Sequence, residues 1–325
     1  MNRYTLKGST ELEAKIAADL RHIAGAASPF CSAGILLGGY GRGEGTPFIH
    51  PDGSQSPFND YDLVVIIDKP TKAVRQKIKA LEKQLTDEIG LPVDLYPYPR
   101  AHLPLCEFSL LNYEMKNGHM VLWGDKNILA AMPAYDPAAI PLSEGTRLLL
   151  NRGKLLLDIK RRLATPRPLT EEERVRFIKF IHKVLLAFGD AALLAAGQYD
   201  VSYAVKKTRI QNVGTCPDRD FVMAGYLSAI GLKEWGDFQS LHDYDIEQEF
   251  SRAINIYLRF MPWYRSQCSN RECSIPKAVA LNLKWNKNVN TRHPREALYE
   301  AIVDLLQDKK SMSHERFYTL QRRFS

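Results

Sequence analysis

The chain reads Asp60-Tyr61-Asp62-Leu63-Val64-Val65-Ile66-Ile67 at residues 60–67, and this stretch sets the class of fold. It begins with two carboxylates and becomes almost wholly apolar and β-branched, which is typical of a strand covered on both faces. Side chains alternate between the two faces of a strand, so Asp60 and Asp62 point the same way, with Cα atoms roughly 6 to 7 Å apart. A buried strand therefore carries two carboxylates at its start.

The rest of the first 142 residues alternates between helical and strand patterns. Apolar residues recur at helical spacing in two segments, each with a capping residue at its start, and short β-rich runs lie around them. This pattern predicts helices over residues 11–25 and 71–90, and strands over residues 33–37, 91–96 and 118–124.

The sequence after residue 142 is helical in pattern and contains no convincing strand. Beyond a first helix that begins near Ser143, it predicts helices over residues 171–197, 203–212, 218–230, 244–261, 294–308 and 313–323. The predicted fold is therefore of the α/β (α+β) class. A domain with a small mixed sheet, residues 1–142, is followed by an α-helical bundle domain, residues 143–325.

Composition excludes several classes of protein. A length of 325 residues fits two domains, and 45% hydrophobic with 25% charged residues excludes global disorder. The net charge of +7 suits an anionic partner or simply keeps the protein soluble. Five cysteines without zinc-site spacing fit reduced thiols, and no signal peptide or membrane span is recognisable, so we expect a cytoplasmic protein. No pattern defines an oligomeric state.

A third aspartate, Asp94, lies in the predicted strand over residues 91–96. If that strand lies beside residues 60–67, three carboxylates converge, and such a cluster would repel itself unless cations sat in it. Mg²⁺ takes carboxylates together with substrate phosphates, and Mn²⁺ is an alternative. Two ions roughly 3.5 to 4 Å apart can activate an attacking oxygen and neutralise a leaving pyrophosphate. The pattern therefore indicates phosphoryl or nucleotidyl transfer.

The turn that follows the first predicted strand reads Gly38-Gly39-Tyr40-Gly41-Arg42-Gly43-Glu44. Glycines let backbone N–H groups approach phosphate oxygens and adopt positive φ, and an arginine binds phosphate through its planar fork. We therefore expect a triphosphate cradle here. The candidate nucleotide-binding residues are Gly38, Gly39, Tyr40, Gly41, Arg42 and Glu44.

These three elements together, the glycine turn, the Asp60/Asp62 strand and the Asp94 strand, resemble the signature of the DNA polymerase beta-type nucleotidyltransferase superfamily. The glycine turn is most similar to that of the uridylyltransferases that modify the PII protein. The resemblance covers about residues 10–125 and implies that Asp60 and Asp62 hold two Mg²⁺ ions. It also implies that Asp94 completes the site of one ion and serves as the base. By the same resemblance, Gly38 and Gly39 bracket the β- and γ-phosphates.

One departure from that superfamily concerns the loop of residues 45–59. Twenty residues separate Gly39 from Asp60, which is about double the gap in most relatives. The loop either folds over the substrate or bulges into solvent. Its path determines where Arg42 and Glu44 lie relative to the metal ions.

Several residues of the helical part are candidates for contact with the nucleotide or the acceptor. They are Lys183, Tyr203, Lys206 and Lys207. Aromatic and cationic side chains suit a base or an acidic acceptor. A solvated helix face explains the same residues without a site. In relatives, the helical domain often closes over the nucleotide or the acceptor.

The function that these features predict is that of an enzyme, a Mg²⁺-dependent nucleotidyltransferase. It would move a nucleoside monophosphate from an NTP such as ATP to a hydroxyl group on a protein, an RNA or a small molecule, with release of pyrophosphate. One alternative is a glycosyltransferase that uses the Asp60/Asp62 pair to hold a metal on a nucleotide-sugar. The other is a non-catalytic module that binds a nucleotide or RNA.

Overall fold

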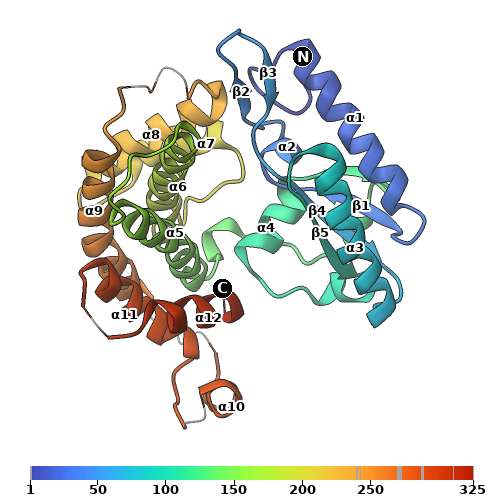
Figure 1. Cartoon of the computed structure of the whole chain (residues 1–325). Coiled ribbons are helices and arrows are strands. Elements are labelled where there is room, and N and C mark those ends of the chain that lie inside the picture. The colour runs from blue at the N-terminus through green and yellow to red at the C-terminus, as the bar shows by residue number, and fades with distance from the viewer. Residues whose placement is uncertain are drawn as a thin grey trace. The chain divides into compact units, whose positions relative to one another are not determined.

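The computed structural model describes residues 2–238, 241, 243–268, 273–286, 289–309 and 311–324. The chain divides into two compact units (Figure 1). The first unit consists of Met1–Ile140, Asp200–Lys206 and Ile230–Asp243, and the second of Pro141–Tyr199, Lys207–Ala229 and Tyr244–Ser325. The segments Asp200–Lys206 and Ile230–Asp243, which the sequence places in the helical domain, thus belong to the first unit.

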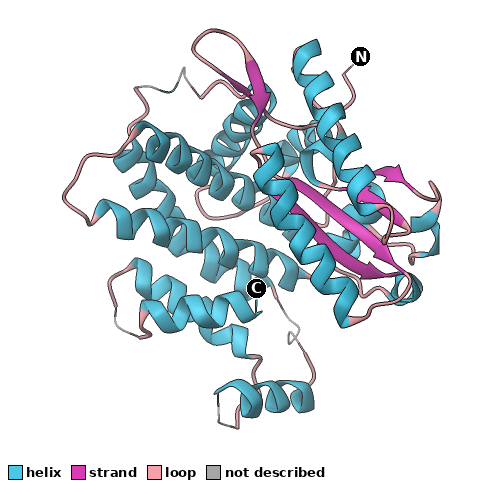
Figure 2. Cartoon of the chain, turned by 45° about the vertical axis from the view of Figure 1, so that its right-hand side comes forward, coloured by secondary structure: helices cyan, strands magenta, loops and turns pink. Residues whose placement is uncertain are grey.

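The first unit is built on a mixed sheet, whose strands are magenta in Figure 2. The sheet has four strands in the order β5-β4-β1-β6. The central strand β4, Tyr61–Ile67, pairs in parallel with β5, Val93–Pro99. On its other side β4 pairs in antiparallel fashion with β1, Ala33–Leu36, which in turn pairs with β6, Met120–Trp123. This is the small mixed sheet of the predicted α/β class.

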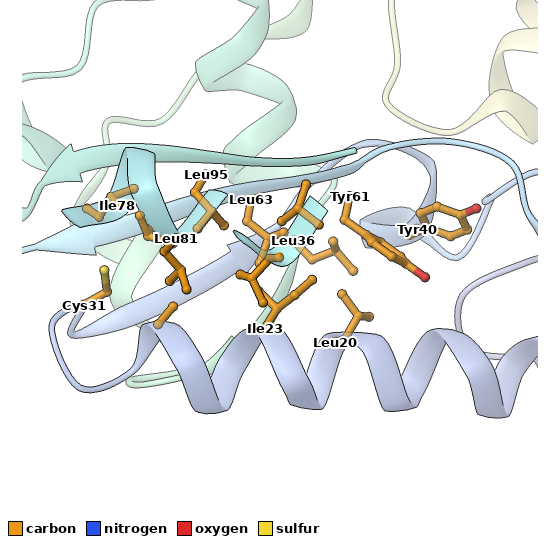
Figure 3. Packing of buried hydrophobic residues seen from close by; sticks show 14 of the residues in the cluster. Leu20, Ile23, Cys31, Leu36, Tyr40, Tyr61, Leu63, Ile78, Leu81 and Leu95 are labelled. Atoms are coloured by element: carbon orange, nitrogen blue, oxygen red, sulfur yellow. The ribbon is translucent and has the colours of Figure 1, made fainter. Parts of the chain in front are cut away.

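Two helices cover one face of this sheet. Helix α1, Thr10–Ala27, is capped by Ser9, whose side chain accepts a hydrogen bond from the N–H of Leu12. Helix α3, Lys72–Ile89, is capped at its start by Thr71 and at its end by Gly90, which adopts the left-handed conformation. Both helices bury an apolar stripe against the sheet (Figure 3), and the labelled core residues include Leu20, Ile23, Leu36, Tyr61, Leu63, Ile78, Leu81 and Leu95.

The opposite face of the sheet buries a second apolar cluster. Ile35 of β1 and Val64 and Ile66 of β4 pack there with residues from outside the sheet, including Leu103 and Met115. These come from the 3₁₀ helix η1, Arg100–Leu105, and from helix α4, Leu110–Asn117, which the sequence pattern did not predict. The prediction that the strand after Asp60 is covered on both faces is confirmed, because both clusters include residues of β4.

The loop between the glycine turn and β4 contains a short hairpin. Strand β2, Pro47–Ile49, pairs with β3, Gln55–Pro57. Phe48 of β2 stacks on Phe58, with ring centroids 5.4 Å apart, and Phe58 lies 4.4 Å from the ring of Phe238. The loop is thus held by an aromatic cluster of the first unit, and Phe238 comes from a segment far away in the sequence.

The second unit is helical, and no strand lies among its described residues. Helices α5, α6, α9 and α11 pack against one another, and Gly145 and Gly153 of α5 leave room for the rings of Tyr264 and Tyr257. The helices that lie wholly or partly in this unit are α5 (Leu142–Leu163), α6 (Glu171–Ala195), α7 (Tyr203–Arg209), α8 (Arg219–Trp235), α9 (Ile246–Gln267), α10 (Ile275–Asn286), α11 (Pro294–Leu306) and α12 (His314–Phe324). Among the described residues, no helix combines the length and the hydrophobicity needed to cross a membrane.

Candidate functional site

Three carboxylates converge at the start of strands β4 and β5. The parallel register places Asp62 directly beside Asp94, and Asp60 stands immediately before β4, two residues from Asp62. One carboxylate oxygen of each residue lies within 4.8 Å of those of the other two. Asp60 and Asp62 share one face of the sheet because they are separated by one strand repeat, and Asp94 shares it because it pairs in register with Asp62.

The surroundings of this cluster raise the pKa of Asp94. Partial burial raises the pKa of the Asp94 carboxyl, and the negative charges of Asp60 and Glu82 raise it further, while Lys79 opposes them. A divalent cation would reverse this effect, because it stabilises the charged form of each carboxylate. The donors are hard oxygens at a spacing that one or two ions can bridge, so the residues fit Mg²⁺ or Mn²⁺.

The glycine turn lies directly against this cluster. Leu37 donates its backbone N–H to the carbonyl of Asp62 at 2.8 Å. Gly38 then adopts a φ of +65°, and a Cβ at this position would lie 2.9 Å from Oδ2 of Asp62. Glycine is therefore favoured at residue 38 by its backbone conformation, and it lets the carboxylate of Asp62 come close to the turn.

The turn continues as a short helix, α2, Gly38–Arg42, instead of an open loop. Gly41 packs tightly on β1, since a Cβ there would lie 2.3 Å from the carbonyl oxygen of Leu36. Tyr40 is only 2% exposed and donates its hydroxyl to the carbonyl of Thr46 at 3.3 Å. The hydroxyl also accepts the backbone N–H of Phe58 at 3.1 Å, and burial raises the pKa of Tyr40 to about 12. Tyr40 and Gly41 thus shape the turn from inside the core.

The side chains of Arg42 and Glu44 bind groups of the protein itself. Nε of Arg42 lies 3.4 Å from Oε2 of Glu44, and its NH1 lies 3.8 Å from Oε2 of Glu114. Oε1 of Glu44 accepts the backbone N–H of Tyr203 at 2.9 Å and the hydroxyl of Ser202 at 3.1 Å. Their predicted role as nucleotide ligands stays a prediction.

A cluster of cations surrounds the ring of Tyr203 within the first unit. The guanidinium of Arg42 lies 5.8 Å from the ring centroid, and Nζ of Lys206 and of Lys233 lie 4.7 and 5.6 Å from it. Lys206 is only 1% exposed. A Cβ at Gly39 would lie 3.2 Å from Nζ of Lys233, so this lysine reaches the glycine turn.

Lys233 is a candidate that the sequence analysis missed. It lies in the last turn of α8, beyond the predicted end of that helix at residue 230, and its neighbours carry no distinctive pattern. Of the four predicted contacts from the helical part, Tyr203 and Lys206 lie in the first unit near the turn. Lys183 and Lys207 belong to the second unit and stay predictions.

No protein-family model matches the chain, and no curated protein matches its sequence. Among the solved structures that are similar to this chain is a spectinomycin adenyltransferase from Enterococcus faecialis, crystallised with ATP and spectinomycin. The sequences are 11% identical, the TM-score is 0.43, and the similarity covers 77% of this chain and 99% of the other. At these values the similarity does not show what this chain does.

Proposed function

We propose that the first unit is a Mg²⁺-dependent nucleotidyltransferase that moves a nucleoside monophosphate from an NTP to a hydroxyl acceptor and releases pyrophosphate. The observation that carries this proposal is the close approach of Gly38 to Asp62, within a cluster of three carboxylates whose oxygens lie within 4.8 Å of one another. The groups proposed to bind the polyphosphate and the metal ions are thus adjacent. Phosphoryl transfer depends mainly on such positioning and charge neutralisation.

The carboxylates would divide the work between them. Asp60 and Asp62 would hold two Mg²⁺ ions, and Asp94 would complete the site of one of them. When bound, the ions neutralise the negative charge that develops on the phosphates and on the leaving pyrophosphate. Asp94 would also take up the proton of the acceptor hydroxyl as the hydroxyl oxygen bonds to the α-phosphorus. The bond from the α-phosphorus to the bridging oxygen of pyrophosphate breaks in the same displacement.

The phosphates would lie along the glycine turn. Backbone N–H groups of Gly38 and Gly39 are the proposed donors, and the cations around Tyr203 supply positive charge beside them. Among these cations Lys233 comes nearest to Gly39, and Lys206 lies at the same ring. ATP is the NTP that we would test first. Lys183 and Lys207 of the second unit remain candidates for contact with the acceptor.

The activity can be tested with each α-labelled NTP and Mg²⁺ or Mn²⁺ over a panel of small hydroxylated molecules, RNA ends and proteins. We expect transfer by the wild type and none by the Asp60→Asn/Asp62→Asn double variant. Asp68→Asn is the matched control, because Asp68 follows the other end of β4, is largely exposed and pairs with Arg100 at 2.6 Å. The proposal fails if the double variant and the wild type give the same products.

A second set of substrates separates the enzyme classes. With labelled UDP-sugars in place of NTPs, a nucleotidyltransferase should release no sugar, whereas a glycosyltransferase would hydrolyse or transfer it. Calorimetry separates the remaining alternative. Nucleotide binding that needs no metal and is unaffected by Asp62→Asn would favour a non-catalytic binding module.

A further inference from the structure

Glu44 is almost buried in the first unit, with only 7% of its surface exposed. Its backbone N–H donates to the carbonyl of Gly39 at 2.8 Å, so the residue is fixed to the glycine turn by its main chain. Its side chain extends to a segment 158 residues away in the sequence. A buried carboxylate is costly unless its oxygens accept hydrogen bonds. The hydrogen-bond partners of Glu44 therefore indicate what this residue does.

The partners of Glu44 lie at the start of helix α7. Oε1 accepts both the hydroxyl of Ser202 and the N–H of Tyr203, at 3.1 and 2.9 Å. The same segment is turned by Asp200, which accepts the N–H of Ser202 at 3.0 Å. Two donors on one oxygen fix both the position and the direction of the chain before Tyr203 and Lys206. The charge of Glu44 is balanced on the other side by Arg42 at 3.4 Å.

We propose that Glu44 is a positioning residue that fixes the segment Asp200–Lys206 against the glycine turn and thereby places Tyr203 and Lys206 beside the phosphate site. This inference rests on the proposed function. Glu44 itself touches no phosphate in this proposal, because its negative carboxylate is held by Ser202, Tyr203 and Arg42 and would repel a phosphate. It connects Gly39, through its backbone, to Tyr203, through its side chain.

Nucleotide binding should depend on the fraction of molecules in which the segment Asp200–Lys206 is ordered. When only a fraction of the protein is competent to bind, the apparent dissociation constant rises in proportion. Loss of a hydrogen bond to a charged group corresponds to about a 10- to 100-fold change in an equilibrium constant. We therefore expect Glu44→Ala to raise the KM for the NTP by up to about 10- to 100-fold, with a smaller change in kcat.

The test compares Glu44→Ala, Glu44→Gln and Ser202→Ala with the wild type. Glutamine keeps an acceptor oxygen for Ser202 and Tyr203, so it should restore most of the loss seen with alanine. Ser202→Ala removes one of the two bonds and remains informative if Glu44→Ala does not fold. The control is Glu173→Gln in the second unit, where a carboxylate likewise accepts a backbone N–H, that of Thr170 at 3.0 Å, and pairs with an arginine. It should leave the KM unchanged.

Hydrogen exchange of residues 200–206, measured without nucleotide, tests whether Glu44 anchors this segment and does not depend on any activity. Protection should fall in Glu44→Ala and be retained in Glu173→Gln. Unchanged protection, or an unchanged KM in a variant that has lost protection, overturns the proposal. If the wild type neither binds nor transfers nucleotides, the proposed function fails and the role in nucleotide binding fails with it. The exchange data would then still decide whether Glu44 anchors the segment.

Discussion

Replacing Gly38 by alanine places a methyl group between the glycine turn and the carboxylate of Asp62. Two effects act together in this variant. The φ of +65° is one that alanine adopts at a cost, and the new Cβ would lie 2.9 Å from Oδ2 of Asp62. Gly90 separates the two effects, because it has a φ of +77° and a Cβ added there would meet no atom within 4 Å. Gly90→Ala is therefore the matched control.

The two magnitudes can be worked out from this geometry. A left-handed backbone costs an L-residue about 1–2 kcal/mol, and the smaller entropy of an unfolded alanine offsets up to about 1 kcal/mol of it. Both variants should therefore lose about 1 kcal/mol of unfolding free energy. Ordinary contacts begin near 3.4 Å, so in Gly38→Ala the Asp62 oxygen must also retreat by about 0.5 Å. Metal sites tolerate about 0.2 Å in ligand distance, and changing a group that orients a metal ligand typically costs about 10- to 100-fold in metal affinity.

The assay has two parts. Urea unfolding measures the loss of stability of each variant, and calorimetric titration with Mn²⁺ in the presence of a non-hydrolysable ATP analogue measures metal affinity. We expect Gly90→Ala to bind Mn²⁺ as the wild type does, and Gly38→Ala to bind it about 10- to 100-fold more weakly. Equal Mn²⁺ affinity in the two variants, at equal stability, would refute the idea that the turn has to approach Asp62 so closely.

Three other predictions concern the electrostatics and packing of the two units. The charge of Asp60 helps to raise the pKa of Asp94, so Asp60→Asn should lower that pKa in metal-free protein. Carboxyl NMR titration can measure the change. An unchanged pKa would contradict the placement of Asp60 beside Asp94. The Arg162 guanidinium lowers the pKa of Glu173 from its usual 4.5 to about 2, so the stability that Glu173 gives is complete above pH 4.5 and is lost between about pH 4.5 and 2. Acid unfolding followed by circular dichroism should therefore be shallower over this range in Glu173→Gln than in the wild type. Phe238→Ala should cost about 3–5 kcal/mol of unfolding free energy and increase hydrogen exchange in residues 47–57, and protection equal to the wild type would show that the aromatic cluster does not hold the hairpin.

The sequence predicted those parts of the fold whose causes are local. The run after Asp60 is apolar on both faces of a strand, and β4 is indeed buried on both faces. The Thr71 cap and the glycine at residue 90 bound a helix, as their backbone preferences require. Helix α4 was missed because its eight residues carry only a short apolar pattern, with Tyr113 and Met115 as its buried residues. The pattern of residues 45–59 did not reveal a hairpin, because Phe48 and Phe58 pack on Phe238, which is distant in the sequence.

Sequence alone determined the four strands of the main sheet, most of the helices and the candidate aspartates, because strand alternation and helix capping act between residues close together in the chain. Only the tertiary structure decided which distant groups meet. It placed Asp94 beside Asp62 through the register of two parallel strands, and it brought Tyr203 and Lys233 to the glycine turn. It also directed Glu44 to protein donors, since a buried carboxylate takes whichever hydrogen-bond donors the folded chain brings to it.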